Sequence, residues 1–228
     1  MMAVFDRKLL LAKFYDFGAT APILILFGLA LRGLLPQLRT DLSSAYVDGA
    51  TLLLSLSLIV RTGTIIYMSI LIFIFVVRRL PIAKLEGVWP RILAVVSADL
   101  NIGVLALPKV QMTLTTAIAS SLLSALGTVA TVLVLIWLGR SFSILPQARK
   151  LVTSGPYKWI RHPLYLSEQI AVVGIMLQFM QPWALLMVAS SLALQLWRMR
   201  YEERILKRTF PAYSNYAAHT ARLIPGVY

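Results

Sequence analysis

Six long apolar stretches dominate the sequence and constrain its fold more than any other feature. They cover about residues 14–35, 50–77, 89–107, 113–138, 164–180 and 183–197. A helix needs roughly 20 apolar residues to cross the hydrocarbon core of a bilayer, and most of these stretches approach that length. Only 14% of the 228 residues are charged, whereas soluble domains carry about 25%. We therefore predict an all-α, polytopic integral membrane protein with about six transmembrane helices, a C-terminal helical hairpin, a cytoplasmic loop and a tail.

Basic residues gather on alternate loops between these stretches, and the net charge is +13. Most Lys and Arg follow the second, fourth and sixth stretches, which predicts that both termini and the loop 140–163 are cytoplasmic. Such charges at the ends of apolar runs favour the lipid bilayer and its anionic headgroups as partner, with no nucleic acid. Residues 1–13 show no clear cleavage site for a signal peptide and are expected to form a retained cytoplasmic helix or arm.

The chain divides by function at about residue 112. Residues 1–112 form an N-terminal scaffold of three spans, and residues 113–228 hold the polar chemistry. Arg61, Asp99 and Asn101 fall inside apolar stretches of the scaffold. Arg61 could pair with Asp99, but we favour the alternative that Arg61 lies at an interface between an amphipathic helix and a true span.

The residue types exclude several kinds of site. The chain has no Cys, which excludes disulfides, thiol nucleophiles and thiolate metal sites. The spacings typical of paired-His metal sites, phosphate-binding glycine loops and serine-hydrolase elbows are also absent. We therefore expect no metal.

Residues 154–165, here called the histidine loop, form a polar, ring-rich segment between apolar stretches. Two prolines in this loop disfavour a continuous helix. Arg161 and His162 could hold a carboxylate or a phosphate, and neighbouring tyrosines could lie against a flat group. Aromatic and basic residues also form interfacial belts without any ligand. We favour the belt for Lys158 and Trp159, and a functional role for His162.

A second polar cluster follows the last apolar stretch, at residues 198–204. If the helix continues, Arg198 and Glu202 share one face, because they are four residues apart. Arg200 and Glu203 share another. The cluster is either a solvated, ion-paired helix end or a carboxylate site for a cation or an ammonium group. With the histidine loop, it would suit a zwitterionic ligand that carries a flat base and a positive centre.

Five motifs in residues 137–228 occur in a characteristic order. They are Leu151 to Tyr157, Arg161 to Tyr165, Glu202-Glu203, Phe210 to Tyr216, and Arg222 to Pro225. This order resembles the isoprenylcysteine carboxyl methyltransferase family, whose clan includes phospholipid N-methyltransferases. The resemblance implies a membrane methyltransferase that uses S-adenosylmethionine and acts on a lipid-like or prenylated substrate, by carboxyl O-methyl transfer as first choice.

The resemblance also implies roles for individual residues. Cofactor-binding positions carry over to Leu151, Val152, Gly155, Tyr157, Arg161, His162, Pro163, Leu164, Tyr165 and Glu203. Substrate and catalytic contacts fall to an Arg and a Glu after the last span, which leaves Arg198 or Arg200 and Glu202 or Glu203. Arg149 and Lys150 stand where the family has a His or Gln, so this part of the pocket departs from the family pattern.

The sequence leaves three functional alternatives to a carboxyl methyltransferase. A phospholipid (ethanolamine) N-methyltransferase would use the same cofactor, and Glu202 or Glu203 could take the proton of its ammonium substrate. An NADPH-dependent sterol-type reductase shares a similar Arg-His-Pro-x-Tyr pattern. A scaffold or transporter would need none of these polar residues for cofactor binding.

Overall fold

A computed structural model describes residues 18, 21–49, 51–84, 87–100, 107–179 and 181–226. The predicted N-terminal arm at residues 1–13, Asn101 and the side chain of Asp99 lie outside the described residues. The proposed pairing of Asp99 with Arg61 is therefore untested.

The described chain is mostly helical, which confirms the predicted class. Its longer helices are α2 (Ala21–Asp48), α3 (Leu52–Val77), α4 (Trp89–Asp99), α5 (Leu114–Leu138), α6 (Pro163–Met176), α7 (Trp183–Thr209) and α8 (Tyr213–His219). Two 3₁₀ turns, η2 (Gly139–Ser141) and η3 (Gly155–Lys158), and two short strands, β1 (Ala83–Lys84) and β2 (Gln147–Ala148), complete it. The strands pair antiparallel and were not predicted.

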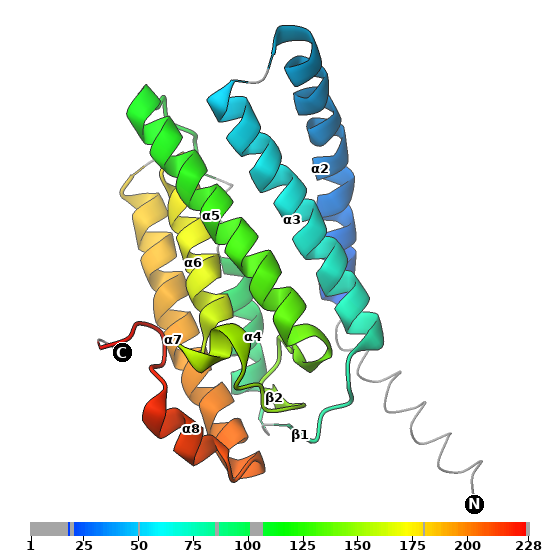
Figure 1. Cartoon of the computed structure of the whole chain (residues 1–228), viewed down its shortest axis with the longest axis vertical. Helices are drawn as coiled ribbons and strands as arrows, with labels where there is room; N and C mark the ends of the chain where they lie inside the picture. Colours follow the sequence, from blue (N-terminus) through cyan, green and yellow to red (C-terminus); the bar gives the residue numbers. More distant parts are fainter. Residues whose placement is uncertain are drawn as a thin grey trace, which may run out of the picture.

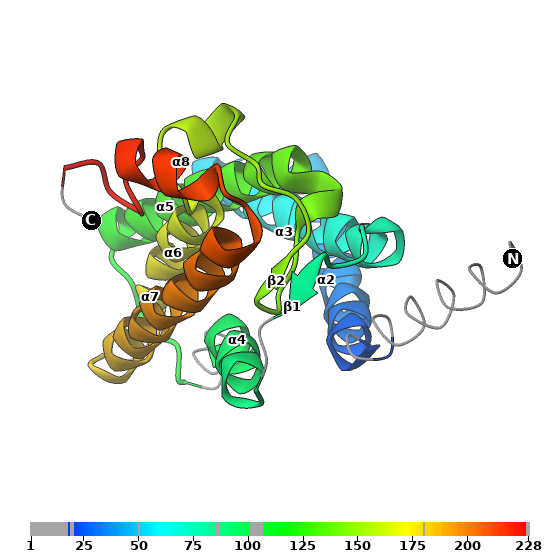
Figure 2. The ribbon, with the colours of Figure 1, turned by 90° about the horizontal axis from the view of Figure 1, so that it is seen from below.

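The helices form a bundle in which α2 and α3 stand together at one side (Figure 1). Helix α3 packs on α5, α5 on α6, α6 on α7, and α7 on α4. Seen along the bundle, α2 and α4 lie at the outside of this arrangement (Figure 2). The strands, α8 and the loop after α5 gather at one end of the bundle (Figure 1).

Two helices in the described chain are long and apolar enough to cross a bilayer. They are α3 and the helix that runs from Leu114 to Ser141, while Pro163–Met176 is a shorter apolar helix. Large apolar side chains point outward from them, including Phe73, Leu126 and Leu133, each more than half exposed. Wide exposed apolar faces are rare in soluble monomers, so these helices indicate a membrane protein. The count of six spans remains a prediction.

Several predicted spans differ from the helices in length. Helix α2 extends to Asp48, well beyond the predicted end at residue 35. Helix α4 has 11 residues and ends at Asp99, and residues 101–106 are not described. Helix α7 continues for 12 residues past its predicted end at residue 197. The additional part, Arg198 to Thr209, is polar, and the prediction followed only the apolar part.

Arg61 lies in the interior of one continuous helix, α3. The expectation of an interfacial break near Arg61 is therefore wrong. Its guanidinium forms an ion pair with Asp41 of α2 at 3.0 Å and donates a hydrogen bond of 2.7 Å to Gln37. A charge within an apolar helix is stabilised by such a partner on the neighbouring helix, so this pair ties α2 to α3.

Small and hydroxylated residues allow α5 and α6 to approach closely. A Cβ atom at Gly127 would overlap the backbone of Ala171. Ser120 donates a hydrogen bond of 2.8 Å to the Gly174 carbonyl, and Thr131 donates one of 3.0 Å to Ser167. Close backbones and buried hydroxyl contacts are typical of helix pairs in membranes. This rigid pair carries the histidine loop at its end.

Candidate cofactor pocket

The histidine loop is held at the end of the bundle by the C-terminal segment. Ile160 forms a parallel bridge with Ala221. The Arg161 amide donates to the Ala221 carbonyl at 2.8 Å, and the His162 amide donates to the Arg222 carbonyl at 3.1 Å. Pro163 occupies the first turn of α6, where its missing N–H costs no helical hydrogen bond. The tail therefore fixes the backbone that presents His162.

The local backbone and packing require a glycine at position 155. Its φ is +59°, a left-handed conformation, and a Cβ atom there would overlap the indole ring of Trp137 on α5. Glycine tolerates this conformation and has no side chain to clash. The turn lets η3 follow directly and bury Tyr157.

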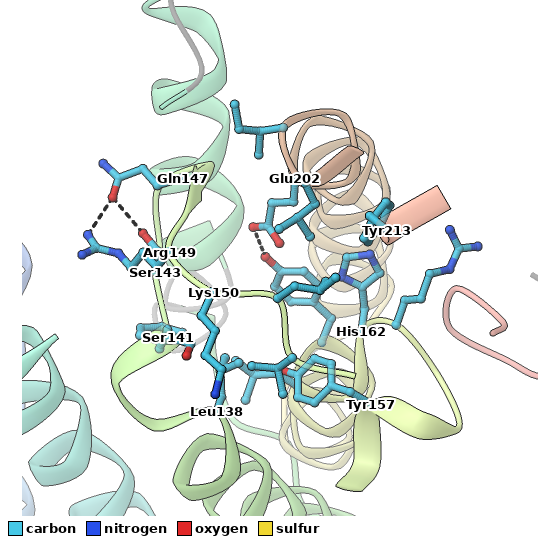
Figure 3. A pocket seen from close by; sticks show the side chains of 18 of the residues that line it. Leu138, Ser141, Ser143, Gln147, Arg149, Lys150, Tyr157, His162, Glu202 and Tyr213 are labelled. Carbon is cyan, nitrogen blue, oxygen red and sulfur yellow. Dashed lines mark hydrogen bonds between the residues drawn. The ribbon is translucent and has the colours of Figure 1, made fainter. Parts of the chain in front are cut away.

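A pocket lies between the loop after α5, the histidine loop, α7 and α8 (Figure 3). Glu202 and Tyr213 approach it from one side, with Lys150 and Tyr157 opposite, as Figure 3 shows. Its lining combines apolar, aromatic, basic and acidic side chains: Leu138, Leu145, Val152, Leu164, Tyr157, Tyr165, Tyr213, Tyr216, Lys150, Arg161, His162 and Glu202 among others.

Glu202 lies at the pocket wall and shares its carboxylate between two donors. The Tyr165 hydroxyl donates to Oε1 at 2.5 Å, and Arg198 Nε donates to the same oxygen at 3.0 Å. The Tyr165 ring stacks on the His162 ring, with centroids 5.5 Å apart. The guanidinium carbon of Arg198 lies over the Tyr165 ring, 5.0 Å from its centroid. The carboxylate, phenol and guanidinium thus form one connected group.

Glu203 points instead into a cluster of basic groups. Its carboxylate lies 3.0 Å from Arg161, 3.1 Å from His162 Nε2 and 2.8 Å from Arg222. Burial alone would raise the pKa of Glu203, but hydrogen bonds from His162 and Arg222 and the charge of Arg161 lower its pKa to about 2. Glu203 is therefore ionised and joins α7 to the histidine loop and the tail.

Two tyrosines connect α8 to η3. The Tyr216 hydroxyl donates a hydrogen bond of 2.6 Å to the Tyr157 carbonyl. Burial, together with the Glu203 charge, raises the pKa of Tyr216 to about 12 against the opposing effect of Arg161. Burial and then the Glu202 charge raise the pKa of Tyr157. Both phenols are therefore protonated at neutral pH.

The structure gathers many of the sequence-predicted residues around this pocket. Those that line it are Leu151, Val152, Tyr157, Arg161, His162, Leu164, Tyr165 and Glu202. Gly155, Pro163 and Glu203 do not line it, and they shape or brace the segments that do. Arg198 lines a neighbouring cavity. Arg200 is exposed and lines neither space.

Sequence reasoning missed several residues of the site. Arg222 was noted only as part of a tail motif, yet it is a direct partner of Glu203. Tyr213 and Tyr216 lie in the Phe210 to Tyr216 motif, whose aromatic spacing was a usable signal. Glu168, which lines the cavity beside the pocket, was not singled out, although a carboxylate within an apolar stretch is itself a signal.

One comparison with known proteins concerns the region that builds the pocket. Residues 105–213 match the sequence model of the phospholipid methyltransferase family, which shares a clan with the isoprenylcysteine carboxyl methyltransferases. The match is to a family of methyltransferases. It covers α5 to α7 and nearly all of the pocket, so the predicted resemblance holds at the level of the clan. The specific carboxyl methyltransferase family remains a prediction.

Two curated proteins are similar over shorter regions. One is the nickel-cobalt-cadmium resistance protein NccN of Alcaligenes xylosoxydans xylosoxydans, 35% identical over 81 residues, which are 35% of this chain and 38% of that protein. The other is the cobalt-zinc-cadmium resistance protein CzcN of Cupriavidus metallidurans, 36% identical over 77 residues, 33% of this chain and 35% of that protein. The chain thus spans little more than a third of these relatives.

Proposed function

We propose that this chain is an S-adenosylmethionine-dependent membrane methyltransferase that acts on a lipid-like or prenylated substrate. The observation that carries the proposal is that the pocket is built by the region that matches the phospholipid methyltransferase family. Residues from the histidine loop, α7 and α8 converge there although they are far apart in sequence.

The chemistry of the lining fits the cofactor. S-adenosylmethionine would supply an activated methyl group, together with a flat base, a carboxylate and an ammonium group that must be bound. Leu138, Val152 and Leu164 offer an apolar surface for the base, and Lys150 offers a cation for the carboxylate. Glu202 offers a carboxylate for the ammonium group or for ribose hydroxyls.

The roles of the two adjacent glutamates differ in this proposal. Glu202 contacts the ligand, whereas Glu203 is a positioning residue that neutralises Arg161 and Arg222 and orients His162. The residues mainly hold two reactants close together away from water, which can lower a barrier by roughly 7–11 kcal/mol. Lys150 takes the place of the family's His or Gln in this pocket.

The methyl acceptor has two candidates. The resemblance of the motifs favours the carboxylate of an isoprenylcysteine-type substrate, which needs no base. The family match favours a phospholipid amine instead. In both cases we propose that the substrate enters from the bilayer between multiple spans, and that the pocket, both termini and the histidine loop face the cytoplasm.

Ligand binding tests the proposal directly. Calorimetric titration of the purified chain in detergent should show saturable binding of S-adenosylmethionine and none of NADPH. Saturable binding of NADPH alone would instead support the reductase. Saturable binding of neither ligand would favour the scaffold or transporter, since that hypothesis assigns the pocket no cofactor.

The acceptor is tested by mass spectrometry. Membranes with and without the protein are incubated with methyl-labelled cofactor, and the lipids and peptides that gain a labelled methyl group are identified. A labelled methyl ester would establish the carboxylate acceptor, and a labelled methylamine would establish the phospholipid type.

A further inference from the structure

The part of α7 beyond its apolar stretch carries four exposed basic residues. They are Arg200, Arg204, Lys207 and Arg208, here called the basic face. Successive residues of a helix turn by about 100°, so these four positions fall within an arc of about 100°. They therefore form one stripe along the helix and do not surround it.

The described chain offers the basic face no acidic partner. Across the described ranges, no Asp or Glu forms an ion pair with any of its four residues. The two glutamates of the same segment are occupied elsewhere, Glu202 by Arg198 and Glu203 by the histidine loop and the tail. The four positive charges of the basic face are therefore not neutralised by the described part of the chain.

Helix stability alone does not explain this arrangement. Lys207 and Arg208 lie in the last turn of α7, where the helix dipole favours a cation. That effect does not extend beyond the last turn, so it gives no reason for Arg200 or Arg204. Like charges four residues apart, as in Arg200, Arg204 and Arg208, instead destabilise a helix. A partner with negative charge would remove this repulsion.

The opposite side of this segment of α7 is packed against other elements. Ile205 is buried with Ala148 of β2 in a small apolar cluster. Arg198 Nη2 donates a hydrogen bond of 2.7 Å to the Ile144 carbonyl, in the loop that leads to β2. This end of α7 lies beside α8 and the strands, at one end of the bundle (Figure 1). The basic face is therefore presented on a fixed helix, and a partner would bind it without the cost of ordering it.

The basic face extends along α7, away from the apolar part of the bundle. The predicted sixth span ends at Trp197, so at 1.5 Å per residue Arg200 lies roughly 5 Å beyond the span and Arg208 roughly 17 Å beyond it. The headgroup layer is only roughly 5–8 Å deep on each side of the hydrocarbon core. For a helix with the usual tilt of about 20°, lipid headgroups reach Arg200 but not Lys207 or Arg208. An elongated partner alongside α7 matches the whole stripe, whereas a flat membrane surface matches only its first part.

We propose that the basic face docks an acidic helical segment of another protein, in which Asp or Glu recurs every three or four residues. Carboxylates at this spacing lie on one face of their own helix, so they pair with the four cations along the length of the basic face. Three of the four cations are arginines, which bind a carboxylate through two parallel hydrogen bonds. The basic face lies outside the cofactor pocket and the neighbouring cavity, so this inference does not depend on the proposed methyl transfer.

Binding of a synthetic peptide tests the docking surface. The full chain in phosphatidylcholine nanodiscs is titrated with a fluorescent, alanine-rich peptide of about 20 residues that carries Glu at every fourth position, a length that supports an isolated helix. A matched peptide carries Lys in place of Glu. We expect saturable binding of the Glu peptide, weakened by added salt, and no binding of the Lys peptide. Failure of the wild type to bind the Glu peptide would overturn the proposal.

Two quadruple variants that lose the same charge show whether the basic face itself is the site. The first replaces the basic face: Arg200→Gln, Arg204→Gln, Lys207→Gln and Arg208→Gln. The second replaces four exposed basic residues elsewhere: Arg32→Gln, Arg39→Gln, Lys109→Gln and Lys158→Gln. The first should bind the Glu peptide at least tenfold more weakly, and the second should bind it as the wild type does. Equal loss of binding in both would show attraction by net charge alone and would overturn the proposal.

A single substitution gives the same answer with less disturbance of the helix. Arg204→Gln should weaken binding of the Glu peptide about two- to fivefold, as expected for the loss of one exposed ion pair. Lys158→Gln, which lies in the histidine loop, should leave the affinity unchanged. Equal affinities of these two variants would contradict the assignment of the site to α7.

Lipid retention distinguishes an acidic protein from the membrane as the partner. The protein is reconstituted with phosphatidylcholine and phosphatidylglycerol and extracted again, and the phosphatidylglycerol that stays bound is measured by mass spectrometry. The wild type and the first quadruple variant should retain similar amounts, because Arg200 alone of the basic face lies at headgroup depth. Less phosphatidylglycerol on that variant, with no binding of the Glu peptide by the wild type, would assign the basic face to the membrane surface and overturn the proposal.

Discussion

The α2–α3 pair and the α5–α8 region use polar residues in opposite ways. In α2–α3, Arg61, Asp41 and Gln37 satisfy one another across two adjacent helices. In α5–α8, polar side chains from the histidine loop, α7, α8 and the tail converge on one pocket. The family match covers α5 to α7 of the second region and none of the first. A polar group in a membrane helix can therefore be a tie between helices or part of a site, and its partners distinguish the two.

The largest effect is expected at Glu202. Glu202→Gln should weaken S-adenosylmethionine binding by about 10–100-fold, because a hydrogen bond to a charged group contributes about 1.5–3 kcal/mol. Calorimetric titration measures the change, with Arg200→Gln as a control, because Arg200 is on the same helix and lines neither the pocket nor the neighbouring cavity. Equal affinity of Glu202→Gln and wild type would place the ligand elsewhere.

Glu203→Gln should act mainly on stability. The substitution leaves Arg161 and Arg222 without their carboxylate partner, which should cost about 1–3 kcal/mol of unfolding free energy. A lower midpoint of thermal unfolding in detergent would show this loss. Lys207→Gln, on an exposed position of α7, should leave the midpoint unchanged, and an equally small effect of Glu203→Gln would contradict its bracing role.

Acid should destabilise the protein through the same carboxylate. The pKa of Glu203 is about 2 in the folded protein and about 4.3 for an ordinary Glu in an unfolded chain. The unfolded chain therefore binds this proton first as pH falls, so the stabilisation is present above about pH 4.3 and is lost toward pH 2. The difference in thermal midpoint between wild type and Glu203→Gln should shrink over this range, and a constant difference would contradict the linkage.

The smallest effect is expected in the α2–α3 pair. Arg61→Gln removes an interhelical ion pair with Asp41, which should cost about 1 kcal/mol, the usual value of a polar contact between membrane helices. Cofactor affinity should stay at the wild-type value, because Arg61 lies outside the pocket. A change in that affinity would show that the two regions are coupled and would weaken the distinction drawn between them.

Local patterns predicted much of the helical framework. Apolar runs bounded by Thr51 and Thr113 became α3 and α5, since each threonine caps the helix that follows it. The break at Pro163 was also read correctly. The sequence left the continuation of the helix through Glu202 open, and α7 does continue through it. The pairing of β1 with β2 was not predicted, because two-residue strands have no periodicity of their own.

The sequence predicted which residue types form the site, but not which side chains contact one another. Spacing placed Arg198 and Glu202 on one helical face, and the structure joins them. The spacing also suggested a face shared by Arg200 and Glu203. In the structure Glu203 instead contacts His162, 41 positions before it, and Arg222, 19 positions after it. Such distant partners meet only through packing.

The sequence by itself determined the helical class, the position of the histidine loop and the set of charged residues near it, because apolar run length and proline chemistry act locally. Only the tertiary structure decided between the adjacent carboxylates. Neighbouring positions on a helix point about 100° apart, so Glu202 faces the pocket while Glu203 faces the loop and the tail. The neighbouring cavity, with Glu168 in its wall, likewise became visible only when α2, α3, α5, α6 and α7 were packed together.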